Sequence, residues 1–246
     1  MDLNKIIKEI KDSSGQESIL SRDSIVILFF RWLSFYTTPI FIFLKVSANL
    51  VTTFSLLFGI IAAILICLNN LYIGYLFYFI SVLFDHIDGN IARYKGQSTF
   101  FGRFIDGFFG IVIISFLHIS FAFFLSNNSN NEILPWVAIL VAVLTPMHHL
   151  FYDRYSTFVR WIKEEGQKIE TLPYIRSNMS WSFYLSDNLQ KILLYVWPFL
   201  FYYNFYWELC ILIYLVLNIF LALSTLMKHT LAAKKNFSLS AKSHRS

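Results

Sequence analysis

Three aspartates and an arginine lie where two long apolar segments of the chain meet. Asp85, Asp88 and Arg93 fall at the end of one apolar run, and Asp106 falls near the start of the next. Charged side chains at the ends of membrane helices are costly to desolvate, so they indicate a functional site by default. Converging carboxylates would repel one another unless cations neutralise them, and Mg²⁺ and Mn²⁺ prefer oxygen ligands of this kind. These residue types therefore favour the binding of a divalent metal ion.

The spacing of these residues suits two neighbouring helices. On a helix Asp85 and Asp88 share one face, and Asp106 and Gly110 share a face of the next helix. A short loop between the two runs can bring both faces together. Five of the nine glycines fall between Gly89 and Gly110. Because glycine costs about 1 kcal/mol inside a helix, this density predicts close helix contact or close approach of a ligand to the backbone.

The same pattern has a plainer interpretation. The three aspartates could be ordinary interfacial residues paired with Arg93, Lys95 and Arg103, and the glycines could serve only helix packing. The residues alone leave both interpretations open.

Composition restricts the class of protein. The chain has 246 residues, of which 57% are hydrophobic and only 14% charged. A soluble domain of this size would leave large apolar patches exposed, so we predict a single integral membrane domain over residues 1–246. The net charge of +5 fits basic residues on the cytoplasmic side of a membrane, and we expect no nucleic-acid partner.

Apolar runs predict the helices. A span needs roughly 20 residues, and runs of about this length occur at 52–69, 72–92, 103–126, 133–152, 188–204 and 206–227, the fifth being marginal. We predict an all-α membrane protein with six transmembrane helices and an N-terminal amphipathic interfacial helix. Its parts are the N-terminal cytoplasmic and interfacial helices at 1–47, a six-helix core at 48–232 and a cytoplasmic tail at 233–246. We expect the basic segment from Lys228 onward to be frayed.

A seventh apolar run, 24–46, is ambiguous because it contains Arg31, Pro39 and Lys45. If it lies in the interface, all 20 Lys and Arg residues fall on the cytoplasmic side or in this run. If it spans, the basic residues of the N-terminus must cross the membrane. The positive-inside rule favours the interfacial arrangement. We therefore expect a site that faces the cytoplasm, in a bacterial inner membrane because the many Ile, Lys, Asn and Phe residues are typical of a low-GC bacterial chain.

The stretch that begins at Asp85 resembles the signature of the CDP-alcohol phosphotransferase (CDP-alcohol phosphatidyltransferase) family. That signature reads Asp-x-x-Asp-Gly-x-x-Ala-Arg, then eight residues, then Gly-x-x-x-Asp-x-x-x-Asp. The residues that match in identity and spacing are Asp85, Asp88, Gly89, Ala92, Arg93, Gly102 and Asp106. Upstream, the segment from Ala48 to Thr52 is similar to the Pro-Asn-x-x-Thr segment that begins the first span of the family. The resemblance covers roughly residues 48–126.

The resemblance implies a membrane enzyme that moves a phospho-alcohol group from a CDP-linked donor to an acceptor hydroxyl and releases CMP. Such enzymes are commonly homodimeric, use Mg²⁺ or Mn²⁺, and serve phospholipid or glycan and polyol-phosphate synthesis. The implied metal ligands are Asp85, Asp88 and Asp106. The implied nucleotide site consists of Asp88, Gly89, Arg93 and Gly102, with Thr52 beside it. The acceptor is not specified.

One position departs from the signature. The final aspartate of the family is a metal ligand and the proposed general base, and here that position is Gly110, which can be neither. Loss of a general base costs about 10²- to 10⁴-fold in rate. Another residue could replace the base, the candidates being His86, Asp153, His148 and His149. An acceptor that is already anionic needs no base, and a catalytically degenerate member would bind cytidine nucleotide or serve membrane assembly without turnover.

Overall fold

The computed structural model describes residues 3–13, 24–97, 99–164 and 181–243. Every regular element in this part of the chain is an α-helix, which confirms the predicted fold class. The eight helices are α1 (Leu3–Ser13), α3 (Ile25–Phe43), α4 (Ala48–Cys67), α5 (Leu71–Tyr94), α6 (Phe100–Asn128), α7 (Ile133–Glu164), α8 (Trp181–Tyr202) and α9 (Trp207–Ser243).

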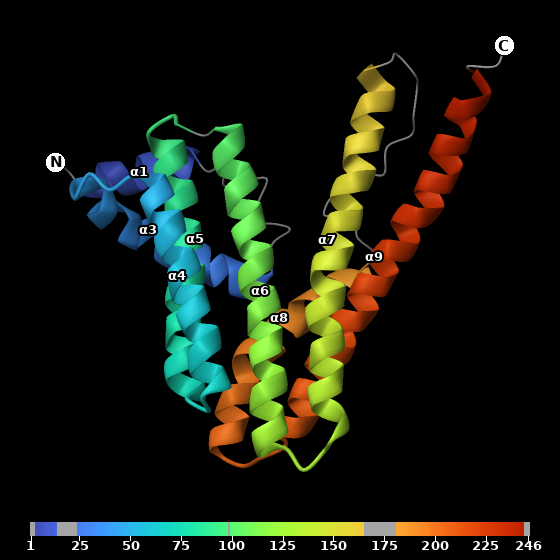
Figure 1. The fold of residues 1–246 in the computed structure, drawn as a ribbon. Coiled ribbons are helices and arrows are strands. Elements are labelled where there is room, and N and C mark those ends of the chain that lie inside the picture. Colours follow the sequence, from blue (N-terminus) through green and yellow to red (C-terminus); the bar gives the residue numbers. More distant parts are fainter. Residues whose placement is uncertain (1–2, 14–23, 98, 165–180, 244–246) are drawn as a thin grey trace.

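The long helices give the molecule two different ends (Figure 1). The turns at 68–70, 129–132 and 203–206 lie together at the lower end and contain no Lys or Arg. The upper end holds α1, the turn between α5 and α6, and the ends of α7 and α9. This separation of charge is the pattern that the positive-inside rule describes for membrane proteins.

Among the residues that the structure describes, six helices are long and apolar enough to cross a membrane, which confirms the predicted number but not the predicted set. The qualifying segments are Ile25–Phe43, Ala48–Cys67, Leu71–Tyr94, Phe104–Asn128, Ile133–Lys163 and Trp207–Lys234. The marginal run that became α8 is not among them, because its first half contains Asp187, Asn188, Gln190 and Lys191. The run that became α3, which we had assigned to the interface, meets the criteria of length and hydropathy instead.

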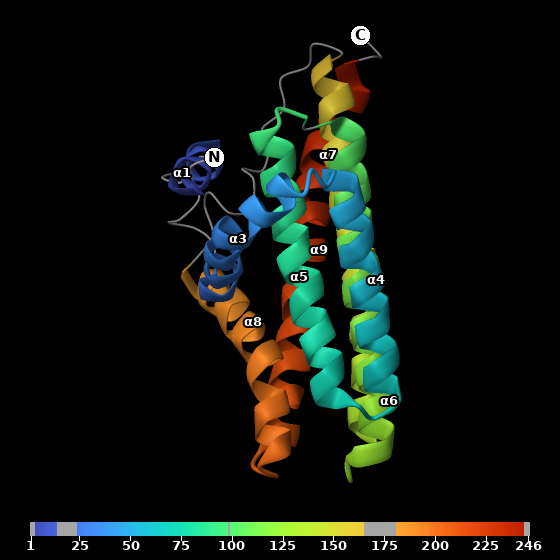
Figure 2. The same ribbon diagram turned by 90° about the vertical axis from the view of Figure 1, so that its left-hand side faces the viewer.

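The α3 helix crosses the α4–α5 pair at a steep angle, near the end where α1 lies (Figures 1 and 2). Its outer face is apolar, with Phe29, Trp32 and Tyr36 exposed, whereas Ser34 and Thr38 are buried against the rest of the molecule. An apolar outer face and a polar inner face suit a helix in contact with lipid. Its steep orientation agrees with an interfacial position, which stays a prediction.

The α1 helix is amphipathic, as predicted. Ile6 and Ile10 are buried, while Lys5, Lys8 and Glu9 are exposed. The two isoleucines pack in a small apolar cluster with residues of α3, α4 and α5. This packing holds α1 against the outside of the helix that carries Asp85 and Asp88.

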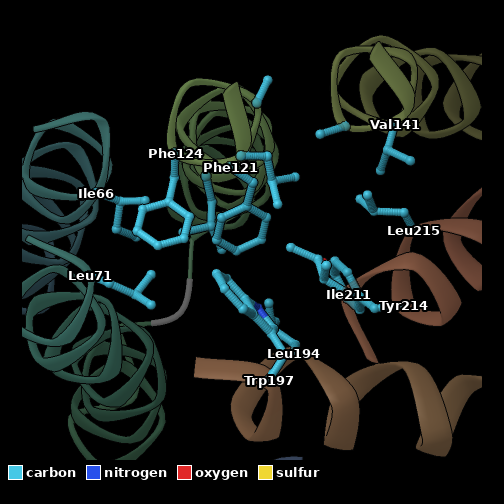
Figure 3. Packing of buried hydrophobic residues seen from close by; sticks show 14 of the residues in the cluster. Ile66, Leu71, Phe121, Phe124, Val141, Leu194, Trp197, Ile211, Tyr214 and Leu215 are labelled. Atoms are coloured by element: carbon cyan, nitrogen blue, oxygen red, sulfur yellow. The ribbon is translucent and has the colours of Figure 1, made fainter. Parts of the chain in front are cut away.

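The main apolar core occupies the lower part of the helical bundle. It joins residues of α4 to α9, among them Ile66, Phe121, Trp197 and Tyr214 (Figure 3). Trp197 is fully buried, and its ring meets that of Phe121 edge to face at 5.3 Å. Such aromatic pairs contribute about 0.5–1.5 kcal/mol beyond their buried area. The core therefore fixes the helices from below the acidic residues.

Two long helices continue farther than the sequence predicted. The α7 helix runs to Glu164, beyond the apolar run predicted at 133–152, and the residues that follow at 165–180 lie outside the described residues. The predicted frayed tail is wrong, since α9 continues to Ser243. Residues 228–243 contain neither glycine nor proline, so nothing in their sequence interrupts the helix.

Candidate functional site

The α4 helix is the support on which the two acid-bearing helices rest. The α5 helix packs mainly against α4, whereas α6 packs against α7 and α4, and in the described part of the chain α5 and α6 touch each other little. Gly59 on α4 permits the close contact with α6, because a Cβ there would lie 2.7 Å from Cγ1 of Ile113. The acids of α5 and α6 are therefore neighbours because both helices adjoin α4, and not because the two helices interlock.

The turn between α5 and α6 has well-defined ends. Gly96 has a positive φ of 61°, and the N–H groups of Gly96 and Gln97 donate to carbonyls of the last turn of α5 at 3.1 and 2.9 Å. Glycine adopts this left-handed conformation without the cost of a Cβ. Thr99 caps α6 by accepting a hydrogen bond from the N–H of Gly102 at 3.0 Å. The short loop predicted between the two runs is confirmed, since α5 ends at Tyr94 and α6 begins at Phe100.

Three carboxyl groups gather at this end of the helices, as the spacing predicts. Asp85 on α5 and Asp106 on α6 lie within hydrogen-bonding reach of each other. The negative charge of Asp88 also acts on Asp85. Asp88 is only 5% exposed. Lys95, a possible partner in the plainer interpretation, instead donates to the Val46 carbonyl at 2.9 Å.

Asp88 has an unsatisfied oxygen. Thr52 and Arg93 lie beside its carboxylate, yet its Oδ2 is buried without a hydrogen-bond partner. The Thr52 hydroxyl donates to the Ala48 carbonyl of its own helix at 3.1 Å. A buried polar atom without a partner costs about 1–3 kcal/mol. Such an atom beside two other carboxylates has the chemistry of a ligand for a cation.

The described residues fit a metal only in part. They contain no ready-made group of three or more His, Cys, Asp or Glu side chains placed around one ion position. Mg²⁺, however, is usually bound by one or two carboxylates together with water and substrate phosphates. The hard oxygen donors of Asp85, Asp88 and Asp106 fit that kind of incomplete site.

Arg93 lies over a glycine at the same end of α5. Its Nη2 donates to Oδ1 of Asn90 at 2.9 Å. A Cβ on Gly89 would be 3.2 Å from both terminal nitrogens of the guanidinium, so a larger residue here would move the arginine by a few tenths of an ångström. Gly102 has a local explanation as well, since a Cβ there would be 3.1 Å from the capping hydroxyl of Thr99.

Asn90 is a residue that the sequence analysis missed. Its Nδ2 donates to Ser34 Oγ at 2.9 Å and to Thr38 Oγ1 at 3.2 Å, both on α3. All three side chains are buried. The sequence does contain a signal for this contact: Ser34 and Thr38 are hydroxyl residues four positions apart in an apolar run, so they share one face of the helix.

The position without an acid is open. Gly110 is exposed, and a Cβ built on it would meet no atom within 4 Å. It lies four residues after Asp106 on α6, so a longer side chain would have room there.

The proposed replacement bases are scattered. His86 is the nearest, with its Nδ1 3.8 Å from Asp85 Oδ2 and 3.0 Å from the Val82 carbonyl. Asp153 is exposed on α7, and in the described part of the chain it is not among the groups that act on the three acids. His148 and His149 are neighbours on α7, and their rings are tilted by 38° with centroids 4.1 Å apart.

These features define an all-helical membrane protein whose acidic and basic groups gather at one end of its helices. A family model described as CDP-alcohol phosphatidyltransferase matches residues 45–203, which is more than half of the chain. The chain therefore belongs to the CDP-alcohol phosphatidyltransferase family, a family of transferases for substituted phosphate groups that generally depend on divalent metals. A search of curated proteins found no match. The α1, α3 and α9 helices lie outside the matched residues.

Proposed function

We propose that this protein transfers a phospho-alcohol group from a CDP-linked donor to an acceptor and releases CMP. The observation that supports this most is the meeting of Asp85, Asp88 and Asp106 from two helices, with Arg93 beside them. Membership of the family supplies the donor class. The acceptor belongs to phospholipid or to glycan and polyol-phosphate synthesis.

Each group has an assigned role in this proposal. Asp85, Asp88 and Asp106 hold a divalent cation, Mg²⁺ or Mn²⁺, which when bound neutralises the diphosphate charge. Arg93 pairs with a phosphate oxygen through its planar guanidinium. The nucleotide lies beside Thr52, Gly89 and Gly102, where the side chains are short or absent.

The reaction is a displacement at phosphorus. The acceptor oxygen forms a bond to the phosphorus that carries the alcohol, and the bond from that phosphorus to the CMP oxygen breaks. CMP leaves with the electron pair of the broken bond, and a hydroxyl acceptor loses its proton. Arg93 would stabilise negative charge that develops on the phosphate oxygens.

The fate of the acceptor proton distinguishes two acceptor classes. A hydroxyl acceptor would pass its proton to His86 or to water, because Gly110 has no side chain to receive it. An acceptor phosphate is already anionic and has no such need. Comparison of hydroxyl and phosphate acceptors with wild type and with His86→Ala separates these cases.

We also propose that the site faces the cytoplasm of a bacterial inner membrane and that the protein is a homodimer. The absence of Lys and Arg from the three lower turns supports this orientation. Cysteines introduced singly at Lys5 and at Asn130, in a variant without Cys67 and Cys210, should react with an impermeant maleimide from opposite sides of the membrane. Labelling of both from one side would contradict the orientation.

The decisive experiment measures CMP release by the purified protein in detergent with Mn²⁺ or Mg²⁺. A panel of CDP-linked alcohols and lipids is offered with hydroxyl and phosphate acceptors. We expect release that depends on metal and on one donor, and that is lost in Asp88→Ala. No release by wild type across the panel, together with release by Gly110→Asp, would show that the chain is not catalytic.

The open space at Gly110 favours one alternative, a family member that binds cytidine nucleotide without turnover. It predicts CMP and CDP binding that Asp88→Ala abolishes, with no product from any donor. Calorimetric titration beside the release assay distinguishes it from the transferase.

A further inference from the structure

Asn90 joins the α3 helix to the arginine of the candidate site through a directional chain of hydrogen bonds. Ser34 Oγ donates to the Arg31 carbonyl at 2.8 Å, and Thr38 Oγ1 donates to the Ser34 carbonyl at 2.6 Å. Each hydroxyl donates its hydrogen to a carbonyl of its own helix, so towards the amide of Asn90 both can only accept a hydrogen bond. The amide nitrogen must therefore face α3, and the Oδ1 of Asn90 is directed to Arg93.

Arg93 lies among charges of both signs. Asp88 and Asp106 attract its guanidinium, and the positive charge of Arg31 on α3 repels it. In the described part of the chain, Arg93 nonetheless forms no ion pair with either acid, and its hydrogen bond goes to Asn90. The guanidinium therefore occupies a position that Asn90 supports by a hydrogen bond and that neither acid supports by an ion pair.

We propose that Asn90, oriented by Ser34 and Thr38, is a positioning residue that holds Arg93 ready for a phosphate of the nucleotide. This rests on the proposed function, since it assumes that Arg93 binds the donor. It gives α3 a role that the family match does not cover, because Ser34 and Thr38 precede residue 45. The α3 helix would then set the affinity of the site for nucleotide phosphates without touching them.

The test is a double-mutant cycle on CMP affinity, measured by calorimetric titration in detergent with Mn²⁺. Asn90→Leu should weaken CMP binding by about 10- to 100-fold, the range found when partners that orient ligating side chains are removed. The double variant Ser34→Ala/Thr38→Val, which keeps side-chain size nearly constant, should produce a similar loss. In the Arg93→Ala background, Asn90→Leu should have almost no further effect, because its only route to the nucleotide is gone.

The matched control is Gln190→Leu, which removes another side-chain amide between helices, the one that donates to Asn218 at 2.6 Å between α8 and α9. It should leave CMP affinity unchanged. Thermal unfolding in the same detergent reports whether each variant is folded, and the Ser34→Ala/Thr38→Val variant serves if Asn90→Leu does not fold.

The outcomes separate the two proposals. If wild type binds CMP and the α3 variants bind it equally well, the positioning role is wrong and the proposed function stands. If Asn90→Leu weakens binding just as much in the Arg93→Ala background, the effect is a general loss of structure and the positioning role is again wrong. If wild type binds no cytidine nucleotide at all, both proposals fail together.

Discussion

The two ends of the helical bundle are built on different principles. Around Trp197 at the lower end, aromatic rings fill the space between helices, and Trp197, Phe121 and Tyr214 are fully buried. At the upper end α5 and α6 scarcely touch, Asp88 has a buried oxygen without a partner, and Gly110 leaves open space. Each end has a buried polar atom without a partner among the described residues, Asp88 Oδ2 at the upper end and Trp197 Nε1 at the lower end. The difference is that aromatic packing fills the lower end, whereas the upper end gathers carboxylates beside open space, as expected where stability is traded for function.

Gly110→Asp gives the largest expected effect and sharpens this comparison. No atom lies within 4 Å of the Cβ position at Gly110. The added side chain therefore has room, and the thermal unfolding temperature should not fall. With hydroxyl acceptors we expect CMP release to rise by up to about 10²- to 10⁴-fold, the usual contribution of a general base. With phosphate acceptors the rate should hardly change. A rate with hydroxyl acceptors that stays at the wild-type value would mean that proton removal does not limit the reaction.

Asp88→Ala tests the site end directly. We expect CMP release to fall by about 10²- to 10³-fold, comparable to the loss of a group that stabilises transition-state charge. Without metal the protein should become no less stable, because the substitution removes a buried oxygen that lacks a partner. The exposed Glu132 in the lower turn is the control, and Glu132→Ala should change neither quantity. A large drop in the unfolding temperature of Asp88→Ala would show that the acid is structural.

Trp197→Ala tests the other end. Loss of this fully buried ring should cost about 3–5 kcal/mol of unfolding free energy. Trp136 on α7 is 72% exposed, so Trp136→Ala should cost far less. Unfolding in detergent, followed by the accessibility of buried Cys210 to a thiol reagent, measures both. Equal costs for the two tryptophans would show that the aromatic cluster does not carry the stability of this end.

The local features of the fold could be predicted from the sequence, whereas its long-range contacts could not. The apolar runs and the acid spacing predicted α5, α6 and the short turn between them, because hydropathy and periodicity act within a few residues. The part of Gly96 in ending α5 was not predicted. We counted the run of α8 among the apolar spans and not that of α3, whereas α3 meets the criteria and α8 does not. In runs of marginal hydropathy a few polar residues are enough to change this assignment. The bond from Asn90 to Ser34 joins residues 56 positions apart, and no local pattern reports such a partner. The roles of the individual acids stay predictions.

The smallest expected effects come from replacing two glycines, Gly59 and Gly107, with alanine. Comparing them tests how far close packing extends along α6. Gly59 on α4 faces Ile113 of α6 at a distance that a Cβ cannot share, while Gly107 on α6, nearer the acids, has nothing within 4 Å of its Cβ position. Gly59→Ala should therefore destabilise by about 1–3 kcal/mol, the cost of overpacking. Gly107→Ala should be neutral or should stabilise by up to about 1 kcal/mol through helix propensity. Unfolding of both variants in one detergent measures the difference. If Gly107→Ala is the more damaging, a surface must cover the upper end of α6, and the expected second copy of the chain would be the first partner to examine by cross-linking.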